Sequence, residues 1–266
     1  MNYQTFAPPE SLKPFIKFFW AFSSDIDSPE MTLRAFPDGC PGVIMVQSES
    51  AVCDIQKKQL PGIYLHGQPV KASELTYSGE ISVLGINFHP HALRSVFGIA
   101  ANELTNTGID LTSIHTKQSI SLSEQLVNEE TVEGRIKMLS NYLLYQHQHN
   151  IRQTDETVKY AIALIAQSKG NLSLKELRQK LQISERGLER RFSQAIGISP
   201  KLFTRIIRFQ ETLDQLRTNS YDKLSDIAYE NEYFDQSYFI RVFKEFTGFS
   251  PLEFKKSMQS NGVCGK

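Results

Sequence analysis

The sequence predicts an α+β chain with two differently built parts. In the first part, short apolar runs alternate with Pro, Gly, Asp and Ser clusters, a pattern typical of a β-sandwich or small barrel. In the last part, a helical pattern occurs twice, and an internal repeat of this kind indicates a structural unit that is present in two copies. We therefore expect a β domain with following helices over residues 1–150. Residues 151–266 should form an all-α domain in which a long helix joins two helix-turn-helix motifs.

Four apolar runs mark the expected strands of the first part. They cover residues 15–22, 42–46, 62–65 and 81–88, and turn-forming residues separate them. From residue 102 to 148 the apolar residues recur with helical spacing, which predicts helices after the β domain. The polar stretch 145–153, which includes His147 and His149, is predicted to be the linker between the two parts.

The repeat pairs residues of two C-terminal segments at an offset of 51 positions. Upstream of the paired segments the match continues at an offset of 50, from Leu177 and Ile183 to Ile227 and Tyr233, so one copy has an extra residue in its turn. Each copy contains a short helix, a tight turn, and a second helix that ends at Gly before Ser-Pro opens a third, which is a helix-turn-helix plan. The residues paired at 51 positions are Leu188, Arg190, Phe192, Gly197, Ser199, Pro200 and Phe203 with Phe239, Arg241, Phe243, Gly248, Ser250, Pro251 and Phe254.

Capping residues predict where these helices begin and end. Ser173 and Glu176 form a capping box, so a helix should start near residue 174 and end near 181. Ser184 can cap the next helix, whose apolar residues share one face, and Gly197 suits a left-handed stop. Ser-Pro then opens a helical pattern from residue 200 to about 218. The second copy repeats these devices with Asp235 as cap, Gly248 as stop and Ser250-Pro251 as restart.

From about residue 154 to 256, the chain resembles the DNA-binding domain of the AraC/XylS family of bacterial transcription regulators. The most specific block includes Ile227-Ala228, Ser237-Tyr238-Phe239 and Gly248-Phe249-Ser250-Pro251. Two positions depart from the family pattern, since Glu232 replaces a usual glycine and Arg178 a usual small residue. The resemblance implies a regulator that binds promoter or operator DNA. It also admits a small-molecule effector, RNA polymerase and a second copy of the chain as partners.

In a helix-turn-helix, the N-terminal, outward residues of the second helix meet base edges in the major groove. These helices should span residues 185–196 and 236–247. Arginine suits guanine, glutamine adenine and glutamate cytosine, whereas lysine suits a phosphate. The alternative is that these side chains are solvated charges, with Glu185 and Glu189 paired to neighbouring arginines. The predicted DNA-binding residues are Glu185, Arg186, Glu189 and Arg190 in the first motif, and Gln236, Ser237, Tyr238, Arg241 and Lys244 in the second, where Ile240 is also expected to face outward.

The N-terminal part resembles the sensor domain of a subgroup of the same family, which is generally taken to be cupin-like. The resemblance rests on the blocks Phe36-Pro37-Asp38-Gly39 and Gly85-Ile86-Asn87-Phe88-His89-Pro90, with Gly67. In related regulators, the helices after this domain dimerise it or dock it on the DNA-binding part. The alternative is that they cover the chain's own β domain. The predicted ligand-binding residues, each of which is alternatively an ordinary core residue, are Trp20, Arg34, Phe36, Asp38, Tyr64 and His66.

The sequence gives little support to an enzyme. His89-Pro90-His91 resembles part of a cupin metal site, but the glutamate that such a site needs is missing, so we predict no metal and no cofactor. No nucleophile, acid–base or phosphate-loop arrangement is present, so we predict no catalytic residue. The competing hypothesis is a cupin-type metalloenzyme or small-molecule binder with an appended helical domain.

Composition agrees with a cytoplasmic regulator in two parts. The chain has 266 residues, 40% of them hydrophobic, and a formal net charge of +0. Residues 154–257 carry roughly +3, a weak basic footprint for DNA. No apolar run of about 18 residues and no signal-like start occur, so no membrane association is expected. Cys40, Cys53 and Cys264 lack CxxC spacing and should be free thiols.

Overall fold

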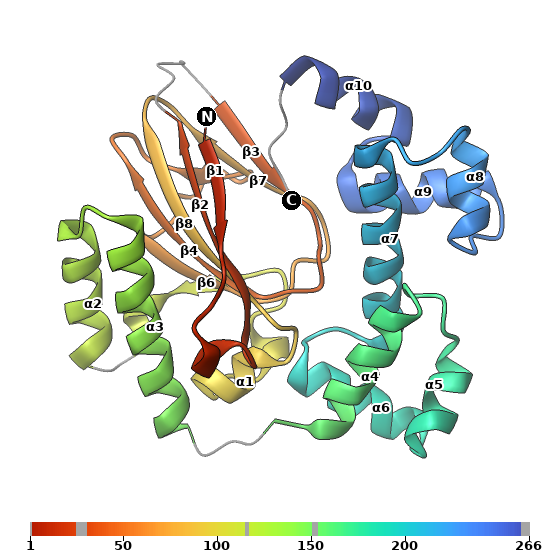
Figure 1. Ribbon diagram of the computed structural model, residues 1–266, viewed down its shortest axis with the longest axis horizontal. Coiled ribbons are helices and arrows are strands. Elements are labelled where there is room, and N and C mark those ends of the chain that lie inside the picture. The colour runs from red at the N-terminus through yellow and green to blue at the C-terminus, as the bar shows by residue number, and fades with distance from the viewer. Residues whose placement is uncertain (1, 25–30, 115–116, 151–153, 262–266) are drawn as a thin grey trace.

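The computed structural model describes residues 2–24, 31–114, 117–150 and 154–261. Two antiparallel sheets form the N-terminal half, and helices form the C-terminal half, which confirms the predicted α+β class (Figure 1). Residues 151–153 of the predicted linker and Cys264 lie outside the described residues, and the domain boundary after residue 150 stays a prediction. Cys40 and Cys53 are free thiols.

The larger sheet has six strands in the order β1-β2-β8-β4-β6-β9, and the smaller has the order β3-β7-β5. A core that includes Phe22, Tyr77 and Val83 fills the space around these strands, with residues of both sheets in contact. The four predicted runs became β2, β4, β6 and β8, because they supply the central apolar strands. The strands are β1 Asn2–Phe6, β2 Ile16–Ser24, β3 Met31–Ala35, β4 Gly42–Ser48, β5 Cys53–Asp54, β6 Ile63–His66, β7 Ser73–Tyr77, β8 Ile81–Phe88 and β9 Gly108–Asp110.

The helices after the sheets cover the chain's own β domain. Leu126, Leu139 and Leu143 of α2 and α3 are almost fully buried in the same core as Leu65 and Phe88 of the sheet. Figure 1 shows α2 and α3 on the side of the sheets away from the C-terminal half. The helices of this half are α1 Ala92–Phe97, α2 Lys117–Asn128 and α3 Val132–His149.

Two sequence predictions for this region are wrong. Residues 102–114 are not a regular helix, because strand β9 pairs with β6 there, between short 3-10 turns at Ala101–Glu103 and Leu111–Ser113. The stretch from Tyr145 to His149 is not linker but the last part of α3. The ring of His147 packs 4.2 Å from that of Phe15, and its Nδ1 lies 3.0 Å from the Ser95 carbonyl oxygen, so tertiary contacts hold this polar stretch in the helix.

In the C-terminal half, the observed helices follow the predicted caps. Ser173 and Glu176 form the capping box of α5, and Ser184 and Asp235 accept backbone N–H bonds at the starts of α6 and α9. Gly197 and Gly248 have positive φ after α6 and α9, as expected of helix stops. The helices are α4 Glu156–Gln167, α5 Leu174–Leu181, α6 Glu185–Ala195, α7 Pro200–Thr218, α8 Leu224–Glu230, α9 Gln236–Thr247 and α10 Pro251–Asn261.

Helix α7 carries both helix-turn-helix units. With 19 residues it is about 28 Å long, and its buried face belongs to one continuous core. Phe203 near its start packs against Phe192 of α6, with ring centroids 6.0 Å apart. Phe209, two turns later, packs against Phe243 and Phe246 of α9 at 5.6 and 5.0 Å. In Figure 1, α5 and α6 accordingly lie by the lower end of α7, and α8 and α9 by its upper part.

The N-terminal half docks onto this helical core through the segment that follows β3. Phe36 is 8% exposed within the C-terminal core, where its ring meets that of Phe254 edge-on at 5.6 Å. The next residue, Pro37, accepts a hydrogen bond from Gln210 Nε2 of α7. Two more hydrogen bonds join the halves. The Ala72 N–H donates to the carbonyl of Phe246 in α9 (3.1 Å), and the Thr105 hydroxyl donates to the carbonyl of Gly197, just after α6 (2.7 Å). The N-terminal half therefore contacts α7 and the ends of both α6 and α9.

Because Phe36 is buried in the core of the other half, we expect Phe36→Ala to uncouple the halves. Truncation of a buried phenylalanine costs about 3–5 kcal/mol, and here the loss falls on the contact between the halves. In calorimetry, the wild type should unfold in one transition and the variant in two, with Phe36→Leu intermediate. A single transition at an unchanged midpoint in Phe36→Ala would show that this contact does not couple the halves.

Candidate nucleic-acid interface

The second helix of each helix-turn-helix motif, α6 or α9, is called its recognition helix. The first recognition helix, α6, has a buried face and a polar face. Leu188 and Phe192 are 2% and 0% exposed and point into the core, as predicted. Arg186 and Arg190 are exposed, and among the described residues neither forms an ion pair. The alternative that Glu185 pairs with a neighbouring arginine of α6 does not hold, because Glu185 pairs with Arg178 of α5 at 2.8 Å. Arg186 and Arg190 thus keep their guanidinium groups available, whereas Arg191, the third arginine of α6, pairs with Asp155.

Arg178 is one of the two departures from the family pattern. Its side chain is 32% exposed, and the ion pair with Glu185 joins the end of α5 to the start of α6. The other departure, Glu232, has φ +53, and the matching residue of the first unit, Gln182, has φ +52. Both turns therefore adopt the left-handed conformation that a glycine would take at less cost.

The second recognition helix, α9, repeats this division. Phe239 and Phe243 are buried, and Gln236, Ser237 and Lys244 are exposed. Ile240, expected to face outward, is partly buried against the C-terminal core, because the hydrophobic face of α9 is wider than that of α6. An ion pair of 2.6 Å with Arg205 of α7 holds Glu245, the one carboxylate of α9.

Tyr238 and Arg241 lie together on the outer face of α9. Tyr238 is half-buried and its ring packs 6.0 Å from that of Tyr233 in the core. The Arg241 guanidinium lies 5.1 Å from the centroid of the Tyr238 ring, a cation–π contact. Tyr238 therefore supports the exposed Arg241 and links its position to the core.

The outer faces of the two recognition helices have similar chemistry. Each recognition helix begins at a side-chain cap, and the positive end of its helix dipole favours a negatively charged partner. Each presents an exposed arginine at the repeat position, Arg190 or Arg241, outside a buried aromatic face. A surface of this kind can bind phosphates and the acceptor atoms of base edges.

The six predicted ligand residues fall into two groups. Arg34 and Phe36 belong to the contact between the halves, since Arg34 pairs with Glu74 at 2.8 Å and its guanidinium lies 4.7 Å from the centre of the Phe249 ring. The other group, Trp20, Asp38, Tyr64 and His66, lies at the strands of the larger sheet and the segment before β4. The prediction that these residues bind a ligand stays a prediction.

Asn87 of β8 joins two residues of the second group, Trp20 and Asp38, a role that the sequence did not reveal. Its Oδ1 accepts from Trp20 Nε1 at 3.0 Å and its Nδ2 donates to Asp38 Oδ2 at 2.8 Å. Burial raises the pKa of Asp38, although the Lys17 charge opposes that shift, and burial lowers the pKa of His66. This network joins the sheet to the segment that carries Phe36 into the other half.

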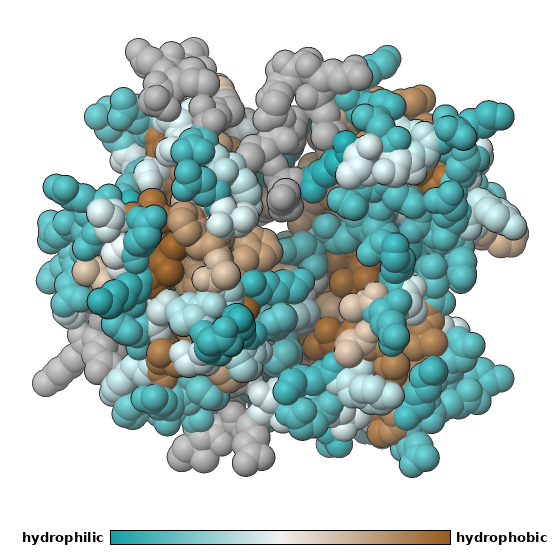
Figure 2. Space-filling model, in the orientation of Figure 1, coloured by the Kyte–Doolittle hydropathy of each residue, from teal (hydrophilic) through white to brown (hydrophobic). Residues whose placement is uncertain are grey.

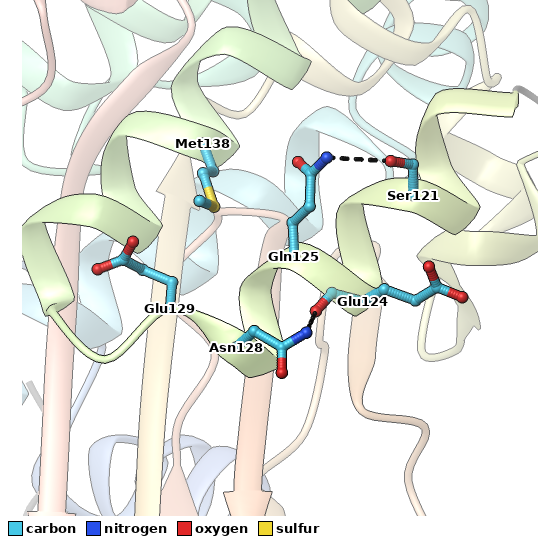
Figure 3. Close-up of a pocket in the computed structure, with 6 residues that line it drawn as sticks. All are labelled: Ser121, Glu124, Gln125, Asn128, Glu129 and Met138. Atoms are coloured by element: carbon cyan, nitrogen blue, oxygen red, sulfur yellow. Dashed lines mark hydrogen bonds between the residues drawn. The ribbon is translucent and has the colours of Figure 1, made fainter.

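The pocket drawn in Figure 3 lies elsewhere, between α2 and α3. Its walls are mostly polar, with Gln125 donating to the Ser121 hydroxyl at 3.1 Å and Asn128 to the Glu124 carbonyl at 2.8 Å. None of the six predicted ligand residues lines it.

His89 and His91 lie beyond the end of β8, so they are not on a strand. Their rings stack at 5.9 Å, and burial lowers the pKa of His91 to about 4. Within the part of the chain that the structure describes, no three His, Cys, Asp or Glu side chains gather in a way that could hold a metal ion. No helix of the described residues has the length and apolar character needed to cross a bilayer.

Two known families match separate segments of the chain. Residues 177–257 match a helix-turn-helix domain, and residues 4–110 match a domain of unknown function. An uncharacterized HTH-type transcriptional regulator of Haemophilus influenzae is 28% identical over 160 residues, which cover 55% of this chain and 53% of that protein. The uncharacterized HTH-type regulator YisR of Bacillus subtilis is 30% identical over 88 residues, which cover 33% of this chain and 30% of YisR. The matched regions thus span about half or less of these curated relatives.

Solved structures show the same fold over the whole chain. ToxT from Vibrio cholerae, in a complex with (E)-4-(8-methylnaphthalen-1-yl)but-3-enoic acid, has a TM-score of 0.53 and 16% identity, with 96% of this chain and 99% of ToxT covered. Another crystal form of ToxT gives 0.52 and 16%, with 96% and 98% covered. The helix-turn-helix domain and the HTH-type regulators that match the chain support its resemblance to the AraC/XylS family, and residues 4–110 carry a domain of unknown function.

The left-handed turn residue generates a stability prediction. Glu232→Gly should raise the free energy of unfolding by about 0.5–1 kcal/mol, because glycine adopts positive φ without the steric cost that a Cβ imposes. Gln182→Gly should act in the same direction in the first unit. Denaturant unfolding measures both effects, with Glu232→Ala as the control that keeps a Cβ. An equal gain from alanine would mean that loss of the carboxylate, and not relief of strain, is responsible.

Proposed function

We propose that this protein is a sequence-specific, double-stranded-DNA-binding transcription regulator and not an enzyme. Its helices α6 and α9 bind successive major-groove segments on one face of the duplex. The observation that carries this proposal is the pair of exposed arginines at equivalent repeat positions, Arg190 and Arg241, on helices whose opposite faces are buried on a shared support. Such a protein acts in the cytoplasm, where a bacterial promoter is found.

The chemistry of each side chain suggests its role on DNA. Arg186, Arg190 and Arg241 suit guanine O6 and N7, Gln236 suits adenine, and Lys244 suits a phosphate. Glu189 is half-exposed and suits a cytosine amino group, whereas Glu185 is already held by Arg178. Ser237 lies at the first turn of α9, where a hydroxyl can bond a base or a phosphate, and Tyr238 acts by positioning Arg241.

We also propose that a small molecule bound by the N-terminal half modulates DNA binding. Support comes from ToxT structures that contain an unsaturated fatty acid or the naphthalenyl butenoic acid named above, both of which are apolar carboxylic acids. In this chain, the network of Asn87, Trp20 and Asp38 lies next to the segment that Phe36 anchors in the helical core. An effector there would shift DNA affinity by favouring one arrangement of the halves. RNA polymerase and a second copy of the chain are the further partners that we propose for such a regulator.

The DNA-binding proposal is tested by the double substitution Arg190→Ala with Arg241→Ala. Each good bidentate contact contributes about 1–3 kcal/mol of discrimination, so the ratio of specific to nonspecific affinity should fall at least about 30-fold. The measurement is a binding titration on a duplex that the wild type enriches from a random pool, against a scrambled duplex of the same length.

The matched control is Lys58→Ala with Lys137→Ala, which removes two exposed positive charges from the N-terminal half. This control should lower affinity for both duplexes little and equally. Unchanged specificity in the arginine variant, with its helical content intact, would remove the basis of the proposed binding mode.

A further inference from the structure

The two helix-turn-helix units differ by one residue in the turn before the recognition helix. In the first unit, one residue, Ile183, separates the left-handed Gln182 from the cap residue Ser184. In the second unit, two residues separate the left-handed Glu232 from the cap Asp235. Since Tyr233 occupies the position of Ile183, the extra residue is Phe234, and it accounts for the change of repeat offset.

The side chain of Phe234 is not part of the protein's core. Tyr233 fills the inward position of the turn at 8% exposure, and its ring contacts Tyr238 and Phe239 at 6.0 and 5.4 Å. Phe234 itself is 93% exposed, the highest value among the large exposed apolar side chains of the described residues. Figure 2 shows brown and pale atoms at the right-hand edge of the molecule, at the position of α8. A phenylalanine held this far into solvent on a tight turn is available to a partner outside the chain.

The position of Phe234 indicates which kind of partner its side chain contacts. It immediately precedes the cap of α9, and the exposed side chains of Gln236 and Ser237 follow it, at the end of the helix that meets base edges. The flanking residues Glu230 and Glu232 are exposed carboxylates, which disfavour a position on the phosphate backbone. Within the major groove, the apolar group that a base offers is the C5-methyl of thymine, and phenylalanine is among the residues that contact it.

We propose that Phe234 is a specificity-determining residue that packs on a thymine C5-methyl beside the base pair contacted by Gln236. This inference rests on the proposed function, and it gives the second motif a preference for a T·A pair that the first motif lacks. Ile183 cannot make the equivalent contact, because it is partly buried against the C-terminal core.

The test replaces single thymines by deoxyuridine, which removes the methyl group and leaves base pairing unchanged. The probe is the duplex that wild-type protein enriches from a random pool, with each thymine of the half-site bound by α9 replaced in turn. For the wild type, one replacement should weaken binding about 3- to 5-fold, the value expected for one buried methyl group. For Phe234→Ala, the thymine and uracil duplexes should bind equally, and Phe234→Leu should keep part of the preference.

Tyr229→Ala is the matched control, because Tyr229 is 87% exposed but belongs to α8 and not to the turn residues between Glu232 and the cap of α9. It should keep the full methyl preference. The proposal is overturned if no thymine of that half-site shows a methyl effect in the wild type, or if Phe234→Ala retains the effect. It is equally overturned if Phe234→Ala lowers transcription in vitro without changing the methyl effect, which would assign the side chain to a protein partner. Failure of the wild type to enrich any duplex would instead contradict the proposed function itself.

Discussion

Burial of helix α7 is the constraint on which the rest of the arrangement depends. Phe203, Ile206 and Phe209 are 0% exposed, and Leu213 and Leu216 scarcely more, so one face of this helix is sealed along its length. The two motifs share this face and therefore share one core. Because packed cores resist continuous deformation, the angle between the recognition helices is set by α7 and not by a flexible linker. The two recognition helices are thereby held as one rigid unit.

The N-terminal half uses the same helix. Phe36 enters the core that α7 organises, Gln210 of α7 holds the Pro37 carbonyl, and Gly39 lies against Phe203, where an added Cβ would come within 3.0 Å of the ring. A change in the sheet network around Asn87 can therefore reach both motifs through three residues of one short segment, 36–39. This is a short physical route between the N-terminal and C-terminal halves, and it involves a packed element that both halves contact.

Local chemistry explains why the C-terminal half could be predicted so closely. Caps such as Ser173 and Asp235, and stops such as Gly197, act within a few residues, so the bounds of α5, α7 and α9 follow from the sequence alone. Contacts between residues far apart in the sequence leave no such local signal. Strand β9 has only three residues and forms because β6 offers a free edge, and His147 stays helical because Phe15 packs on it. For the candidate site, the outward arginines were predictable from the inward aromatic residues. The support of Arg241 by Tyr238, the capture of Glu185 by Arg178 and the bridging role of Asn87 needed three-dimensional contacts.

The central claim is that α7 holds both recognition helices at a fixed spacing, and the spacing of the half-sites tests it most directly. Insertion of about 5 bp between the two half-sites of the enriched duplex turns one of them to the opposite face of the DNA, since one helical turn is about 10.5 bp. If α7 holds α6 and α9 rigidly, the protein can then bind only one half-site. We expect the inserted duplex to bind no better than a duplex with one half-site destroyed. Binding of the inserted duplex with the affinity of the original would show that the two motifs move independently, and would contradict the account.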